Sequence, residues 1–130
     1  MEKVLVCITP QGNSSRLIDK GFELARSFAP GVAEVHILYV QRGDDVFGPG
    51  GTPELLQSLF DYGAERGGVI HAVCGNDAAA EIIAFIRAES ITRAVLGEPP
   101  KDAAAPDGVI GRIKRKLPWM EIVVLERNVE

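Results

Sequence analysis

Five short runs of apolar, largely β-branched residues predict five β-strands. They lie at Lys3–Ile8, Glu34–Val40, Val69–Cys74, Arg93–Leu96 and Glu121–Leu125. The first run, KVLVCI, is continuous rather than alternating, which is typical of a strand buried on both faces. The pattern therefore favours strands that are covered on two sides.

Between these runs, apolar residues recur at spacings of three and four, which predicts four amphipathic helices. The helices are expected to begin at Asn13 or Ser14, at Pro53 after Thr52, at Asn76 or Asp77, and at Val109. The predicted core-facing residues are Leu17, Ile18, Gly21, Phe22, Ala25 and Phe28, then Leu56, Leu59, Phe60 and Gly63, then Ala79, Ile82, Ile83 and Ile86, and finally Ile110, Ile113 and Leu117.

Strict alternation of strand and helix favours an α/β fold, a parallel sheet with helices on both faces. Ligands of such sheets bind at the carboxyl ends of the strands, where the strand order reverses. If the first strand is central, that site is lined by Thr9–Ser15 and by the proline-rich segment Gly97–Asp107. The glycine-rich segment Gln41–Thr52 predicts a second long loop that is mobile, and a lid is one interpretation of it.

Composition narrows the class of protein further. The 130 residues are 46% hydrophobic and 25% charged, as expected for one globular domain spanning residues 1–130. The net charge of −4 disfavours nucleic-acid binding. No apolar stretch is long enough to cross a membrane, and no signal peptide is evident, so we expect a cytoplasmic protein without membrane insertion.

The potential metal ligands are few and scattered. Cys7 and Cys74 have no paired spacing, and His36 and His71 are the only histidines. Zinc requires about four clustered ligands, so we expect no metal and two buried structural thiols. Each histidine is expected to be a satisfied strand residue, because no nucleophile or acid pairs with either by any motif. Asp44-Asp45 could hold a divalent ion, but a solvated loop is the preferred interpretation.

Four segments resemble the universal stress protein family. They are Lys3–Ile18, Val73–Ile86, Ile91–Gly97 and Pro118–Leu125, and the closest similarity is to the domain of this type in potassium-sensing histidine kinases. The resemblance implies a Rossmann-like, adenine nucleotide alpha hydrolase-like fold with strand order 3-2-1-4-5. It also implies that many relatives bind ATP, through glycine N–H groups and a hydroxyl in a G-x2-G-x9-G-[ST] signature, and through an acidic residue after the first strand.

The sequence departs from that signature at both ends. Gly97 matches its first glycine, but Pro100 replaces the second and has no N–H to donate. The final pair falls on Ile110-Gly111 or on Gly108-Val109, so neither register supplies a hydroxyl, and Thr9 stands at the acidic position. We therefore expect that a family-type ATP site is absent.

The candidate ligand-binding residues all belong to the predicted carboxyl edge. They are Thr9, Pro10, Gly12, Ser14, Ser15, Val40, Gly97, Gly108, Val109, Gly111 and Arg112. Ordinary turn and cap chemistry is the alternative for the first group. Arg112 could reach a phosphate, whereas Lys114–Lys116 suit the negative end of the helix dipole. Tyr39 with Ser14-Ser15 partly resembles the residues with which some potassium-sensor domains of this type bind a cyclic dinucleotide. The alternative is a tyrosine at a strand end whose ring is packed.

These observations favour a regulatory or binding domain without catalytic residues. The alternatives are an ATP- or nucleotide-binding stress protein with slow or no hydrolysis, and an interaction module that docks on a transporter or sensor. The resemblance also implies a homodimer through the last strand, Trp119 to Leu125, whose apolar run would lie at a sheet edge. The sequence does not identify the ligand, the partner or the signal.

Overall fold

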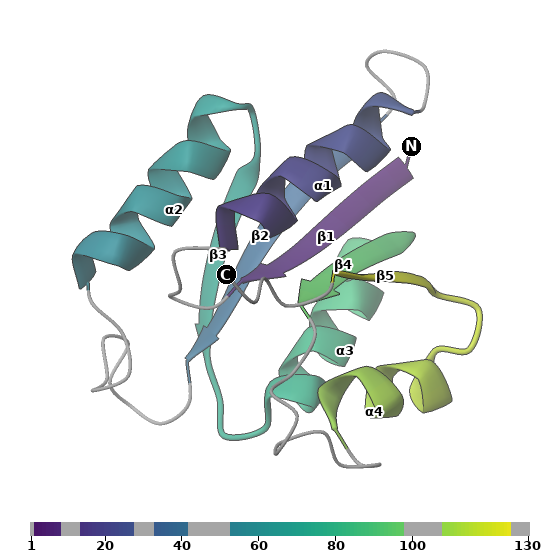
Figure 1. The fold of residues 1–130 in the computed structure, drawn as a ribbon. Coiled ribbons are helices and arrows are strands. Elements are labelled where there is room, and N and C mark those ends of the chain that lie inside the picture. The colour runs from purple at the N-terminus through teal and green to yellow at the C-terminus, as the bar shows by residue number, and fades with distance from the viewer. Residues whose placement is uncertain (1, 9–13, 28–32, 42–52, 98–107, 126–130) are drawn as a thin grey trace.

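The computed structural model describes residues 2–8, 14–27, 33–41, 53–97 and 108–125, and Figure 1 shows their arrangement. Strands and helices alternate along the chain. The elements are β1 (Glu2–Ile8), α1 (Ser14–Arg26), β2 (Ala33–Gln41), α2 (Pro53–Glu65), β3 (Val69–Cys74), α3 (Ala78–Glu89), β4 (Arg93–Gly97), α4 (Val109–Lys116) and β5 (Glu121–Leu125). Each predicted element is present, with ends that differ by one or two residues within the described part of the chain.

The five strands form one parallel sheet in the order β3-β2-β1-β4-β5. This confirms both the parallel sheet predicted from alternation and the strand order implied by the resemblance. β1 is central, and β3 and β5 lie at the two edges. The strand order reverses between β1 and β4, because the chain leaves β1 towards β2 and later returns to pair β4 with β1 on its other side.

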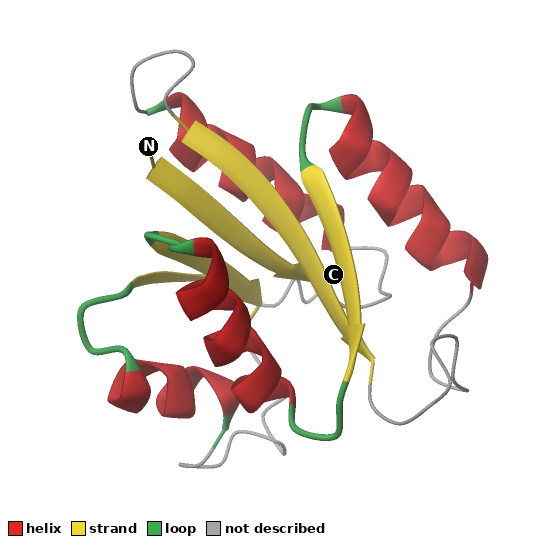
Figure 2. Ribbon diagram, turned by 180° about the vertical axis from the view of Figure 1, so that it is seen from behind, coloured by secondary structure: helices red, strands yellow, loops and turns green. Residues whose placement is uncertain are grey.

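Helices cover both faces of the sheet, α1 and α2 on one face and α3 and α4 on the other (Figures 1 and 2). Strand residues of alternating parity supply the two cores. Val4, Val6, Ile37 and Val95 pack with α1 and α2, whereas Leu5, Leu38, Ala94 and Leu96 pack with α3 and α4. This double covering explains why the sequence of β1 is apolar at nearly every position.

Phe28, the last core residue predicted for α1, lies outside the described residues. Ile18 and Gly21 of that helix are buried, and Leu17, Phe22 and Ala25 are half-buried against the same core. The inward stripe predicted for α1 is therefore confirmed as far as Ala25.

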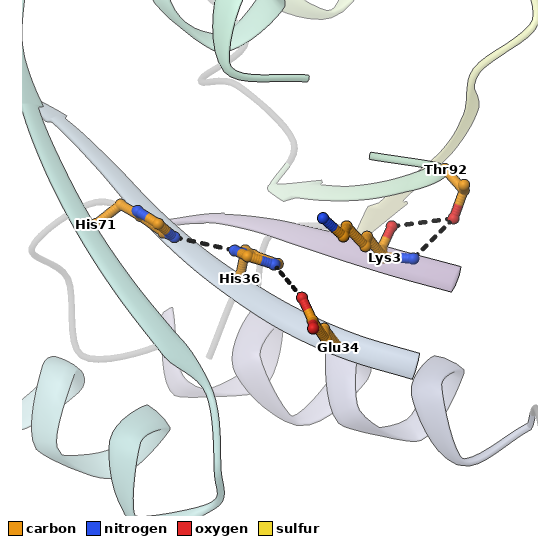
Figure 3. A network of polar contacts seen from close by, with 5 residues as sticks. All are labelled: Lys3, Glu34, His36, His71 and Thr92. Atoms are coloured by element: carbon orange, nitrogen blue, oxygen red, sulfur yellow. Dashed lines mark hydrogen bonds and ion pairs between the residues drawn. The ribbon is translucent and has the colours of Figure 1, made fainter. Parts of the chain in front are cut away.

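The two ends of α3 are defined by local chemistry. Asp77 is the N-cap, and its side chain accepts a hydrogen bond from the Ala80 N–H at 3.3 Å. Ser90 ends the helix in the left-handed conformation, with φ at 57°. Thr92 then joins this end of α3 to β1 by three hydrogen bonds with Lys3. The Thr92 N–H donates to the Lys3 carbonyl at 2.9 Å. The Thr92 Oγ1 donates to the same carbonyl at 3.0 Å and accepts from the Lys3 N–H at 3.2 Å (Figure 3).

Candidate functional site

The carboxyl ends of β1 and β4 lie side by side at the reversal of strand order, as predicted for the ligand site. Ile8 ends β1 and Gly97 ends β4, and the two strands are directly paired. α1 begins near this edge on one face of the sheet and α4 on the other face (Figure 1). The partial positive charges of two helix N-termini therefore belong to this edge.

The structure places only part of the residues predicted after the first strand. Thr9, Pro10 and Gly12 lie outside the described residues. Ser14 is the first residue of α1 and is only 1% exposed, and Ser15 follows it half-buried. Ser14 is already the first helical residue, and Asn13, the other residue proposed for the helix start, lies outside the described residues.

Gly97 ends β4 beside Leu17 of α1. Among the described residues, a β-carbon placed at Gly97 would meet the two terminal methyl groups of Leu17, at 3.6 and 3.8 Å, which is ordinary van der Waals contact. Packing therefore does not require glycine at this position. Val40 lies half-buried near the end of β2, one strand further along the same edge.

The remaining candidates form the start of α4. Gly108 is its N-cap in an extended conformation, with φ −64° and ψ 168°, and it offers no side-chain cap. Val109 and Gly111 follow in the first turn, and the Arg112 N–H donates to the Gly108 carbonyl at 3.0 Å. Without a capping side chain, backbone N–H groups of this turn are suited to an external acceptor such as a phosphate.

Arg112 already has a partner in the structure. Its Nη1 donates to the Asp77 Oδ1 at 2.6 Å, which joins the first turn of α4 to the N-cap of α3. The hydrogen bond from Arg112, assisted by that from Ala80, holds the pKa of Asp77 below its usual range. A phosphate at this edge would have to share Arg112 with Asp77.

Tyr39 is packed as its alternative interpretation expected, with 7% of its surface exposed. Its hydroxyl donates to the Gln41 side-chain oxygen, two residues along β2. Desolvation raises the pKa of Tyr39, followed by the nearby Cys74. The tyrosine hydroxyl is thus engaged at the end of its own strand.

The two histidines are satisfied strand residues, as expected, and they are hydrogen-bonded to each other. His36 Nδ1 and His71 Nε2 are 2.9 Å apart, and His36 Nε2 is 3.0 Å from Glu34 Oε1 (Figure 3). Glu34 pairs with His36, a contact that no sequence motif indicated. The sequence did hold a signal for the contact with Glu34, because residues two apart on a strand, such as Glu34 and His36, lie on the same face. The contact with His71 could not be foreseen, because it depends on β3 being the neighbour of β2.

The prediction of two buried thiols is wrong for one of them. Cys74 ends edge strand β3 and is exposed, whereas Cys7 lies half-buried on central strand β1. Burial raises the pKa of the Cys7 thiol to about 12. The sequence did not reveal this difference, because both strands are apolar. The position of each strand in the sheet, central or at the edge, decides how far its cysteine is covered.

Over the described ranges, no three histidine, cysteine or acidic side chains lie close enough together to hold a metal ion. The same part of the chain contains no helix long and apolar enough to span a membrane.

Known proteins resemble this chain in structure, but no match was found by sequence. No family model matches the chain, and no curated protein matches it. Among solved structures, a universal stress protein in complex with cAMP is 15% identical, covers 99% of this chain and 98% of its own, and has a TM-score of 0.67. A universal stress protein from Archaeoglobus fulgidus is 14% identical, with coverage of 95% and 93% and a TM-score of 0.69.

A universal stress protein family protein from Arabidopsis thaliana, solved with AMP bound, gives a similar result. It is 16% identical to this chain, covers 99% of it and 94% of its own length, and has a TM-score of 0.64. The chain thus has the Rossmann-like α/β fold of the universal stress proteins over nearly its whole length.

Proposed function

We propose that this chain, which has the fold of the universal stress proteins, is a non-enzymatic regulatory domain of that family that works in the cytoplasm. In this proposal it binds a small anionic ligand, a nucleotide by preference, between the ends of β1 and β4. The observation that carries the proposal is the reversal of strand order between β1 and β4, where α1 follows β1 on one face of the sheet and α4 begins on the other face without a side-chain cap. Two proteins of the same fold that were solved with cAMP and with AMP support a nucleotide as the ligand.

The proposal favours a ligand with one phosphate over ATP. Pro100 removes one backbone donor from the segment after β4, and no serine or threonine follows Thr92 to supply the signature hydroxyl. The one guanidinium at the start of α4 is shared with Asp77. We expect an ATP dissociation constant weaker than about 100 μM, which corresponds to roughly −5.5 kcal/mol.

Thermal unfolding in the presence of AMP, cAMP, ADP, ATP with Mg²⁺ and cyclic dinucleotides tests this proposal. A ligand present at 100 times its dissociation constant stabilises the folded state by about 2.7 kcal/mol, a rise of several degrees in Tm. Low-micromolar ATP binding by calorimetry would favour the ATP-binding alternative. No shift with any nucleotide, together with recovery of a membrane transporter or sensor in a pull-down, would favour the docking module.

A variant pair locates the site. Gly97→Val adds a side chain that suits a strand at the end of β4, where a β-carbon makes only ordinary contact with Leu17 among the described residues. It should therefore abolish the ligand-induced rise in Tm while the protein stays folded. Val69→Thr changes an exposed residue at the opposite, amino end of edge strand β3 and should leave the rise intact. Equal responses of the two variants would place the ligand elsewhere.

We also propose that the domain forms a homodimer through β5. This strand lies at the sheet edge, its Val124 is 37% exposed, and Trp119 just before it is 63% exposed. Exposed backbone groups on an edge strand favour pairing with a second copy across a two-fold axis.

A further inference from the structure

A line of hydrogen-bonding groups runs from the surface into the core beneath α3. His36 on β2 is only 4% exposed, and its two ring nitrogens have different partners. Nδ1 lies 2.9 Å from Nε2 of His71 on β3, and Nε2 lies 3.0 Å from Oε1 of Glu34 (Figure 3). The two imidazole rings are stacked, with centroids 5.2 Å apart and planes 19° apart.

The surroundings hold this pair in place. Phe85 of α3 makes T-shaped contacts with both rings, with centroid distances of 4.6 Å to His71 and 6.1 Å to His36 and interplanar angles of 70° and 66°. The charged groups around the pair are Glu34 on β2, Glu89 on α3, which acts on His71, and Lys3 on β1, the register partner of Glu34. The Glu34 side chain is 42% exposed, so the buried His36 is connected to solvent through a carboxylate.

The geometry restricts where protons can sit. The Glu34 carboxylate accepts a hydrogen bond, so His36 carries its proton on Nε2 and leaves Nδ1 as an acceptor. The 2.9 Å contact then requires His71 to donate from Nε2, and the Nδ1 of His71 is left as the basic nitrogen. In this neutral state each of the two contacts contains one hydrogen.

We propose that His36 and His71 form a pH-responsive switch that accepts one proton without rearranging and opens when it accepts a second. The first proton binds at Nδ1 of His71, and the shared hydrogen moves from His71 Nε2 to His36 Nδ1. The resulting imidazolium of His36 faces the Glu34 carboxylate, and both hydrogen bonds are kept. A second proton puts hydrogens on both nitrogens of the 2.9 Å contact, which then repel each other.

The opening should occur on the β3 side. His36 is buried and keeps Glu34 as its counter-ion, whereas His71 is half-buried on an edge strand that pairs only with β2 in the described sheet. Desolvation lowers the pKa of His71, the charge on His36 lowers it further, and Glu89 opposes both effects. Doubly protonated, the pair therefore separates by rotation of His71 away from Phe85 and towards solvent.

Side-chain nitrogen chemical shifts, measured between pH 8.5 and 4.5, test the proton positions. At high pH we expect both histidines as Nε2–H tautomers, followed by two separated titration steps that both residues sense. In the second step the nuclear Overhauser contact between His71 and Phe85 should disappear. Two independent single-step titrations near the ordinary value of about 6.5, with that contact retained, would overturn the proposal.

Stability measurements test the switch in a second way. The unfolded chain binds the second proton below about pH 6.5, whereas the folded chain resists it, so stability must fall as the pH drops from 6.5. The loss reaches up to about thirtyfold in the folding equilibrium constant at pH 5 if folded His71 stays neutral. His71→Gln, whose amide can still donate to His36 Nδ1, should remove most of this loss, and an unchanged loss in that variant would contradict the proposal.

Glu34→Gln gives an independent variant if His71→Gln does not fold. It preserves an acceptor for His36 but removes the counter-ion, so the first titration step should move to lower pH. Glu23→Gln makes the same charge change on α1, where Glu23 is ion-paired with Lys20 at 3.1 Å, and should leave both steps unchanged. Identical titration of these two variants would also overturn the proposal.

Discussion

At the scale of single residues, two glycines determine how closely the helices of one face approach the sheet. A β-carbon at Gly21 of α1 would lie 2.3 Å from Val6 Cγ2, and one at Gly63 of α2 would lie 2.2 Å from Ile37 Cδ1. No side chain fits at such distances without movement of its neighbour. The sequence placed both glycines on inward stripes, and the structure gives the physical reason.

The substitution Gly63→Ala tests this close approach. We expect it to destabilise the fold by about 1–3 kcal/mol from overpacking, despite the better helix propensity of alanine. Ile37→Val removes the methyl group that would clash, so the double variant should lose less stability than the sum of the two single variants. Urea unfolding of all four proteins measures this, and strict additivity would show that Ile37 is not the obstacle.

The two cysteines should differ sharply in reactivity. Cys74 is exposed, whereas burial raises the pKa of Cys7 to about 12, so Cys7 holds almost no thiolate at pH 8. Native protein treated with iodoacetamide should gain one label by mass spectrometry, and unfolded protein should gain two. Native Cys74→Ser should gain none, and rapid labelling of Cys7 in that variant would contradict its burial.

At the scale of elements, one carboxylate joins the starts of α3 and α4, two helices that also pack in the same apolar core. Asp77 caps α3 and also pairs with Arg112 at 2.6 Å, so a single side chain links two helix starts at the candidate ligand edge. The cap was one of two candidates in the sequence. The partner on α4 was not foreseen, because 35 residues separate the two positions.

Replacement of Asp77 should lower stability in two graded steps. Asp77→Asn keeps an acceptor for the Ala80 N–H but loses the charge that pairs with Arg112, and Asp77→Ala loses both, so Tm should fall further for alanine.

The pH dependence of stability tests the charge of Asp77 separately. The pKa of Asp77 is lowered in the folded state, so the contribution of its charge to stability is complete above the ordinary value of 3.8 and is lost as the pH falls through the lowered value. The Tm difference between wild type and Asp77→Ala should therefore shrink in strong acid, and a constant difference down to pH 2 would show that its charge is unimportant.

At the scale of the whole molecule, both edges of the sheet carry exposed apolar side chains. Trp119 just before β5 is 63% exposed and Val124 within β5 is 37% exposed, and Val69 at the start of β3 is 43% exposed. Apolar continuity identified β5 as a strand, and the strand order shows that it lies at an edge. That position makes it available to a second copy of the chain.

The proposed dimer gives a direct measurement. Sedimentation at micromolar concentration should give about twice the chain mass of 14.0 kDa, and Val124→Lys should reduce it to the monomer because a charge would be buried at the interface. Val69→Lys introduces the same charge on the other edge strand and should leave the dimer intact. A wild-type protein that stays at 14.0 kDa up to about 100 μM would show that no dimer tighter than roughly −5.5 kcal/mol forms.

The sequence by itself determined the local elements and their class of arrangement. Continuous apolar runs such as KVLVCI and the apolar stripes of the helices show which residues are buried, because the apolar face of each element must pack against another element. Alternation then predicts a parallel sheet with a ligand edge, since crossover connections leave few topologies. These inferences depend on neighbours in sequence, and the described structure confirms the sheet and its helices.

Only the tertiary structure decided which polar side chains meet. His36 and His71 lie on separate strands, and their contact depends on β2 and β3 being neighbours in one register. The pairing of Asp77 with Arg112 and the exposure of Cys74 likewise depend on strand order and on the positions of helices across the sheet. Periodicity assigns a residue to a face, but its partner there is fixed by packing between segments far apart in the chain.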